Sequence, residues 1–176
     1  MNSGHIFAGL LLKLKPKKLS IMPFGLAVTF ESYEYKKLIE TKKIIIAFAG
    51  PLTNILISIG LLFIHMDQNL KQIMIYSNIL VALFNLIPIY PLDGGRILKG
   101  ILHINFGIRT AEFYTNIISK IMVAIITISS SILILYVHNI AILFINLYLL
   151  YLVLKEDIKY KKRKDIYNKI LENQAI

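Results

Sequence analysis

Four polar residues of this strongly apolar chain could do chemistry: His5, Asn54, Asn85 and Asp93. Ionisable or strongly polar groups at membrane depth are costly to bury, so their presence there usually reports a functional site. Imidazole nitrogens and carboxylate oxygens are both common metal ligands. Asp93 is therefore a candidate metal ligand, and His5, Asn54 and Asn85 are further candidates for functional residues.

The stretch NLIPIYPLDGGRIL, residues 85–98, surrounds Asp93 with two prolines and two glycines. Pro-x-Asp-Gly is ordinary turn chemistry, and a plain turn is one interpretation. The other is a metal ligand, because Pro88 and Pro91 lack backbone donors and break a helix before its end. Unwound backbone at membrane depth survives only where it lines a protein cavity. Asp93 could then turn inward and meet His5, which would lie roughly 12 Å into the membrane.

Four apolar stretches are candidate membrane spans, since a helix needs roughly 20 residues to cross a bilayer core. A fifth apolar piece, Ile6 to Leu14, is about half that length and would stop midway. The last of the four is short, and we expect it to extend back through the YVHN stretch or to pack tilted. The four are Ile44 to Ile64, Ile73 to about Leu92, Ile117 to Val137 and Ile140 to Leu154.

The basic residues predict an orientation for these spans. Eight Lys lie between Lys13 and Lys43, one follows the first full span, four Lys or Arg lie between Arg96 and Lys120, and seven follow from Lys155. Links that are rich in Lys and Arg alternate with links that are poor in them, as the positive-inside rule expects. We therefore expect a multi-pass protein of the cell membrane with a cytoplasmic C-terminus, in which the last two spans form an antiparallel hairpin.

The stretch KKLSIMPFGLAVTFE, Lys17 to Glu31, has the character of strands interrupted by Pro23 and Gly25. It predicts a short β-hairpin at the cytoplasmic interface, which could present an edge to an extended peptide. A linker dipping into the headgroups is the alternative. The predicted fold class is an all-α polytopic membrane protein, a bundle of transmembrane helices with one small interfacial β-hairpin.

Composition narrows the classes of partner and of site. The net charge of +10 fits either nucleic acid or a membrane surface, and in a chain of mean hydropathy +0.65 it indicates anionic lipid beside cytoplasmic loops. We expect no nucleic-acid partner. The absence of cysteine excludes thiolate zinc sites. His65, His103 and His138 lie at predicted loops or ends and are interpreted as solvated.

Three motifs in order resemble the site-2 intramembrane zinc metalloproteases, in the branch of the bacterial stage IV sporulation factor B protease. The Asn85–Gly95 stretch, with Pro88, Pro91, Asp93 and Gly94, is similar to the second signature of that family. AGPLTN, Ala49 to Asn54, is similar to the start of another characteristic helix, and GHIFAGLLLKLKPKKLSIMPFG to the sequence after the first signature. The resemblance covers about residues 4 to 155.

This resemblance implies a membrane-embedded protease that binds Zn²⁺ and cleaves membrane-associated partner proteins in regulated proteolysis, with sporulation as one setting and regulatory membrane partners. It also implies that His5 and Asp93 are zinc ligands. Asn85, Pro88, Pro91, Gly94 and Asn54 would shape the site or hold substrate. The domain prediction is a metalloprotease-like unit over residues 1–154 and a basic cytoplasmic tail over 155–176.

One part of the family pattern is absent. The family's His-Glu-x-x-His falls on MNSGH, so Met1 stands at the position of the first ligand and Asn2 at that of the catalytic Glu. A preceding span and a C-terminal regulatory domain are also expected and not present. We therefore expect this chain to be impaired or inactive as a protease. The alternatives are a catalytically silent membrane scaffold that binds a partner protein, and a transporter, which the lack of an internal repeat disfavours.

Overall fold

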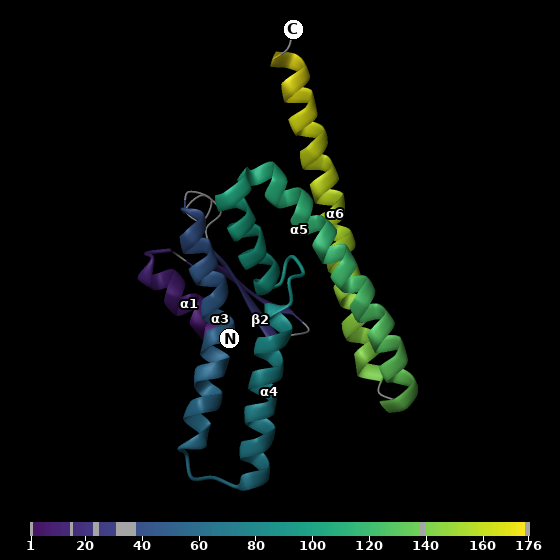
Figure 1. The fold of residues 1–176 in the computed structure, drawn as a ribbon. Coiled ribbons are helices and arrows are strands. Elements are labelled where there is room, and N and C mark those ends of the chain that lie inside the picture. Colours follow the sequence, from purple (N-terminus) through teal and green to yellow (C-terminus); the bar gives the residue numbers. More distant parts are fainter. Residues whose placement is uncertain (1, 15, 23–24, 31–37, 138–139, 175–176) are drawn as a thin grey trace.

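A computed structural model describes residues 2–14, 16–22, 25–30, 38–137 and 140–174. The fold is almost entirely helical, as predicted (Figure 1). Helix α1 (Asn2–Leu11) packs against the long helix α3 (Glu40–Leu62), and the two share a small apolar cluster of Ala8, Leu14 and Ile46. The half-length first helix predicted from the sequence therefore lies against the first full span.

Two antiparallel strands follow α1. They are β1 (Pro16–Met22) and β2 (Gly25–Phe30), and β2 contacts α1. The predicted Lys17–Glu31 hairpin includes residues 23, 24 and 31, which lie outside the described residues. Its place at a membrane interface stays a prediction.

Helices α3 and α4 (Gln68–Leu86) run side by side and are joined by a short turn (Figure 1). Asp67 begins α4, because its carboxylate accepts hydrogen bonds from the Asn69 and Leu70 amides at 3.0 Å. The second predicted span was expected to continue to Leu92, but α4 ends at Leu86. Pro88 and Pro91 explain the early end, since neither can donate to a helical carbonyl.

Helix α5 (Asp93–Val137) starts immediately after this break. The sequence predicts a cytoplasmic loop between the second span, ending at about Leu92, and the third, beginning at Ile117. The structure is instead helical there, with one corner at Gly107 (φ 80°, ψ 168°). That backbone conformation is open to glycine alone. In Figure 1 the first part of α5 leads away from the end of α4, turns, and returns alongside α6 (Ile140–Gln174). The ligand candidate Asp93 thus begins a helix deep in the molecule.

Helix α6 continues without interruption through the predicted domain boundary at residue 154 and on to Gln174 (Figure 1). The fourth span was expected to extend back through YVHN, residues 136–139, or to pack tilted. Tyr136 and Val137 belong to α5, and residues 138 and 139 lie outside the described residues. The observed extension is instead toward the C-terminus. Inside the α5–α6 pair, Thr127 donates a hydrogen bond to the Asn146 side-chain oxygen at 3.1 Å, which ties the two helices together.

Among the residues that the structure describes, two helices are long and apolar enough to cross a membrane, Glu40–Leu62 and the Asp93–Ile134 part of α5. The helices of the α3–α4 hairpin also carry many large apolar side chains on their outer surfaces. Soluble monomers rarely expose contiguous apolar surface of this kind. The exposed residues of these two helices include Ile45, Phe48, Leu56, Ile59, Leu62, Ile73, Leu80 and Leu83.

Candidate metal centre

The structure brings together the two residues that the sequence nominates as ligands. His5 Nε2 lies 3.1 Å from Asp93 Oδ2, although α1 and α5 are far apart in the chain. Both residues are buried, with 9% and 6% of their surfaces exposed. Two ligands of one tetrahedral zinc lie about 3.3–3.6 Å apart, given Zn–N and Zn–O distances of about 2.0–2.2 Å. The observed separation is close to that range.

The opposite edge of the His5 ring is fixed by a backbone group. His5 Nδ1 lies 2.8 Å from the Ile46 carbonyl oxygen in α3. A carbonyl can only accept, so Nδ1 carries the proton, and in the neutral form of the ring Nε2 presents its lone pair toward Asp93. Metal-ligating histidines are commonly oriented by such a hydrogen bond on their second nitrogen.

Asp93 Oδ2 needs a positive partner at this position. It is buried, and no hydrogen bond reaches it from the residues that the structure describes. With the neutral tautomer set by Ile46, two lone-pair atoms face each other at 3.1 Å. Either a second proton on the imidazole or a shared cation resolves that repulsion. The pair therefore fits a metal ion as well as it fits an ion pair.

Glycines let α1 approach α3 closely enough to place the imidazole. A Cβ atom on Gly50 would lie 2.2 Å from His5 Nε2, and one on Gly4 would lie 2.0 Å from the Thr53 hydroxyl oxygen. Neither distance is compatible with an unshifted structure. Gly50 belongs to the AGPLTN motif and is followed by the buried Pro51, which has no N–H for the preceding turn of α3. The motif thus forms the part of α3 against which the His5 ring packs.

Glycines also allow the loop before Asp93 to fold tightly onto the start of α5. A Cβ atom on Gly94 would lie 2.1 Å from the Leu86 carbonyl oxygen, and one on Gly95 would lie 2.3 Å from the Tyr90 nitrogen. The predicted site-shaping role of Gly94 therefore has a steric basis. Pro88 and Pro91 lie in the same loop, between α4 and α5.

The two asparagines are buried but differ in what the structure shows of them. Asn85 donates from Nδ2 to the Val81 carbonyl of its own helix at 2.8 Å, and it is 5% exposed. That hydrogen bond is a local helix contact. Asn54 is 3% exposed and lies one turn beyond Gly50 on α3. A role for either amide in holding substrate stays a prediction.

Two ligands do not make a complete catalytic zinc site. Asn2, at the position where the family pattern has Glu, is the first residue of α1. No cluster of three or more His, Cys, Asp or Glu side chains that could hold a metal occurs among the described residues. His65 and His103 add no ligand there, and His138 lies outside the described residues. His65 is exposed, and His103, expected at a solvated loop, lies inside α5 with Nδ1 3.1 Å from Glu40 Oε1.

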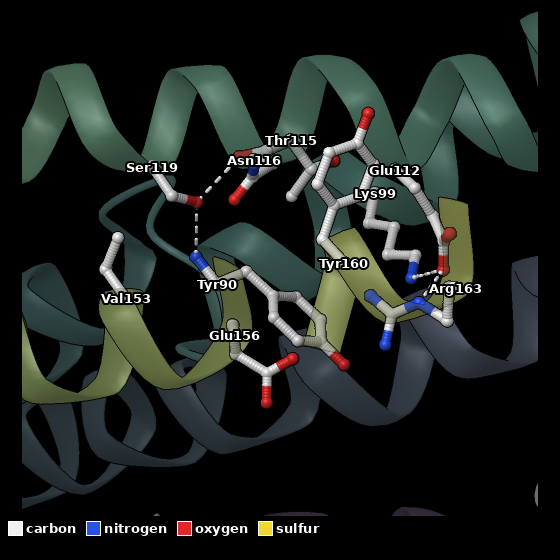
Figure 2. A pocket seen from close by; sticks show the side chains of 10 residues that line it. All are labelled: Tyr90, Lys99, Glu112, Thr115, Asn116, Ser119, Val153, Glu156, Tyr160 and Arg163. Carbon is white, nitrogen blue, oxygen red and sulfur yellow. Dashed lines mark hydrogen bonds and ion pairs between the residues drawn. The ribbon is translucent and has the colours of Figure 1, made fainter. Parts of the chain in front are cut away.

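A second polar region lies between α5 and α6 (Figure 2). Glu112 Oε1 contacts Lys99 Nζ at 2.9 Å and Arg163 Nε at 3.0 Å, which links the first part of α5, the part beyond the Gly107 corner, and α6. Sequence reasoning assigned Arg163 to a solvated tail and did not nominate Glu112. Only the helical geometry brings these charges together.

Sequence reasoning also missed Gly50, the Ile46 carbonyl and Ser119. Gly50 could have been found, because it stands in a quoted motif beside a helix-internal proline. The Ile46 carbonyl could not, since any residue supplies one. Ser119 accepts a hydrogen bond from the Tyr90 amide at 2.9 Å, across 29 positions of sequence (Figure 2). A single serine in an apolar helix carries no sign of such a partner.

Comparison with known proteins gives consistent matches. Residues 65–129, which include the Asp93 loop, match Peptidase family M50. A zinc metalloprotease of Methanocaldococcus jannaschii is 30% identical over 122 residues, covering 65% of this chain and 34% of that protein. Stage IV sporulation protein FB of Bacillus subtilis is 29% identical over 99 residues, covering 54% of this chain and 34% of that protein.

The fold matches a solved structure as well. The site-2 protease from Methanocaldococcus jannaschii superposes with a TM-score of 0.66 at 26% identity, over 88% of this chain and 71% of that one. The chain spans about a third of the length of the curated relatives it matches. The sequence motifs, the family model and the fold agree, and each makes this chain similar to peptidase family M50 and the site-2 proteases.

Proposed function

We propose that this chain forms the core of a membrane-embedded zinc metalloprotease of the site-2 type, with His5 and Asp93 as two of the zinc ligands. The observation that carries the proposal is the buried His5–Asp93 contact of 3.1 Å, with the imidazole oriented by the Ile46 carbonyl. A buried lone pair facing a buried carboxylate oxygen is a suitable donor set for a divalent cation.

The residues of the chain supply binding and orientation. Bound zinc would supply Lewis acidity and a water of lowered pKa, which is the chemistry of peptide hydrolysis. His5 offers one nitrogen and Asp93 one oxygen, and the Gly4 and Gly50 contacts fix how far α1 stands from α3. The surrounding apolar helices restrict bulk water at this depth. Any proton transfer needs a further acid–base group.

Asn2 cannot supply that group. An amide neither accepts nor releases a proton near neutral pH, and the loss of a general base costs on the order of a hundred to ten thousand fold in rate. Catalytic zinc usually has three protein ligands, whereas His5 and Asp93 are two. We infer that a chain with this sequence cleaves peptide bonds weakly or not at all. Stronger activity requires a Glu in the place of Asn2 and a His in the place of Met1.

The proposed substrates are membrane-associated proteins, and regulated proteolysis is the proposed setting. Support comes from the relative named for stage IV of sporulation and from the apolar outer surfaces of α3 and α4. The strand pair β1–β2 would offer an edge to an extended segment of substrate. We propose a multi-pass arrangement in the cell membrane with the C-terminal end of α6 in the cytoplasm, on the basis of the alternating basic links.

A catalytically silent scaffold is the second candidate. The presence of Asn2 at the position of the catalytic Glu favours it, because an amide cannot act as the general base. A scaffold would keep the site-2 architecture and bind partner proteins without cleaving them. Zinc content and cleavage together distinguish the two functions.

The test compares two helix-initiating aspartates in detergent-purified chain. Asp93→Asn should lose most bound zinc, because a ligand oxygen is replaced by an amide. Asp67→Asn should retain it, since Asp67 is exposed and Asn also caps helices well. Zinc per chain is measured by mass spectrometry after equilibration with a zinc buffer. Equal zinc in the Asp93→Asn variant and the parent would leave Asp93 as a turn residue and overturn the proposal.

Cleavage is tested with a tethered membrane substrate and excess zinc. The chain as written should give no chelator-sensitive product above an Asp93→Ala control. Met1→His combined with Asn2→Glu, placed behind an upstream span, should restore cleavage if the chain is a protease domain. Restored zinc without any cleavage would favour the scaffold.

A further inference from the structure

The loop before Asp93, residues 87–92, has few backbone groups with which to hold its shape. Two of its six positions are proline and have no N–H. The amides of Ile87, Ile89 and Leu92 donate locally, to Phe84, Ile87 and Ile89. The amide of Tyr90 differs, because it donates out of the loop to Ser119 Oγ at 2.9 Å.

Ser119 is itself held firmly. It is 2% exposed, and its hydroxyl donates to the Thr115 carbonyl of α5 at 2.7 Å (Figure 2). The hydroxyl proton is therefore directed into the helix, and the oxygen lone pair is directed at the loop. Because the Thr115 carbonyl, one turn earlier in α5, takes the hydroxyl proton, Ser119 can only accept a hydrogen bond from the Tyr90 amide.

Apolar packing supports the same loop from the same side. Ile89 and Leu92 form a buried cluster with Val123 of α5 and with Leu149 and Val153 of α6. Hydrophobic contacts limit how far the loop can move but do not select one rotation of its backbone. The directional contact is the Tyr90–Ser119 hydrogen bond. It lies three residues before the ligand candidate Asp93.

We propose that Ser119 is a positioning residue for the metal centre, which sets the conformation of the 87–92 loop and thereby the place of the Asp93 carboxylate against His5. Ser119 contacts neither ligand and acts through the Tyr90 amide. The zinc-binding consequence rests on the proposed function. The effect on the His5–Asp93 contact does not, because that contact joins two side chains of the chain itself.

The first measurement is made on metal-free protein. In ¹⁵N-histidine-labelled chain, the His5 Nε2 resonance should shift when Asp93 is changed to Asn, since the two atoms are in contact. Ser119→Ala should reproduce most of that shift or split the resonance, and Ser119→Thr should restore the parent spectrum, because threonine keeps the hydroxyl. Ser130→Ala is the control. Ser130 is also a buried serine of α5, 5% exposed, and its hydroxyl donates to the carbonyl of Thr127 in its own helix.

The second measurement is zinc affinity by competition with a chelating dye. Ser119→Ala should bind zinc about tenfold to a hundredfold more weakly, the usual effect of losing a group that orients a ligand. Ser119→Thr and Ser130→Ala should stay near the parent. Should Ser119→Ala match Ser130→Ala in both measurements, the inference is overturned. Should the parent bind no zinc at His5 and Asp93, the proposed function fails, and the histidine spectrum still decides the role of Ser119.

Discussion

At the scale of single residues, the close contact between Gly50 and the His5 ring determines the position of His5 Nε2, the candidate ligand nitrogen. Gly50 and Gly60 share helix α3, yet a Cβ atom would lie 2.2 Å from His5 Nε2 at the first and would meet nothing within 4 Å at the second. A comparison of alanine substitutions at the two glycines therefore separates the steric effect on the site from the gain in helix propensity that alanine brings at either position.

Gly50→Ala should displace His5, with about 1–3 kcal/mol lost in stability from overpacking and zinc binding weakened about tenfold or more. Gly60→Ala should leave zinc binding unchanged and should stabilise α3 by up to about 1 kcal/mol. Zinc titration and thermal unfolding followed by circular dichroism measure both effects. Parent-like zinc binding by Gly50→Ala would show that His5 is not confined as the structure indicates.

At the scale of elements, the corner in α5 depends on one residue. Gly107 has φ 80° and ψ 168°, and a Cβ atom there would meet nothing within 4 Å. Any cost of Gly107→Ala is therefore backbone strain, about 1–3 kcal/mol. Thermal unfolding in detergent should show this loss, with Gly60→Ala as the comparison. An unchanged midpoint would mean that the corner tolerates another backbone conformation.

The α5–α6 contact should also depend on pH through Asp157 of α6. Burial raises the pKa of Asp157, but hydrogen bonds from Lys120, Asn116 and Lys161 outweigh it and lower the pKa from 3.8 to about 2. A lowered folded-state pKa contributes stability that is complete above about pH 4 and is lost as pH falls toward 2. The exposed lysine partners limit the contribution to about 1–2 kcal/mol.

Asp157→Asn should remove this part of the acid sensitivity, whereas Asp165→Asn, at an exposed position of the same helix, should keep it. Unfolding midpoints between pH 2 and pH 6 give the measurement. Identical pH profiles for the parent and Asp157→Asn would show that Asp157 does not stabilise the α5–α6 contact.

The elements also show where sequence reasoning stops. The apolar runs predicted the helices α3 and α4, and the Pro88–Pro91 spacing predicted the break before Asp93. The end of α4 at Leu86 was missed, because hydropathy continues through the loop while the backbone does not. The His5–Asp93 meeting was permitted by the sequence but not required by it. The contacts of the Ile46 carbonyl and of Ser119 could not be predicted from the sequence. The first involves a backbone group, which every residue has, and the second a serine with no distinguishing motif around it.

At the scale of the whole molecule, the helix ends divide between two sides. The C-terminal end of α6 and the turn within α5 lie at one end of the molecule, and the turn between α3 and α4 lies at the other (Figure 1). This arrangement matches the alternation of basic links along the chain. It predicts that the Lys42 and Lys164 positions share the cytoplasmic side and that Gln68 lies on the opposite side.

The chain has no cysteine, so single cysteines report their own position. Cysteines placed at Lys42 and Lys164 should resist an impermeant thiol reagent in intact cells, and both should react after permeabilisation. A cysteine at Gln68, which is exposed at the start of α4, should react in intact cells. Labelling of the first two and protection of the third would invert the orientation.

The meeting of His5 with Asp93 also has a consequence for biosynthesis. A ribosome adds roughly 5–20 residues per second, so His5 is made several seconds before its partner. The contacts of His5 with Gly50 and with the Ile46 carbonyl can form before Asp93 is available, because both residues belong to α3, which is made earlier. The loop that precedes Asp93 gains its hydrogen bond from the Tyr90 amide only after Ser119 has been made, which is later still. A nascent chain therefore holds a lone imidazole, a weak zinc ligand by itself, until α5 has been made as far as Ser119.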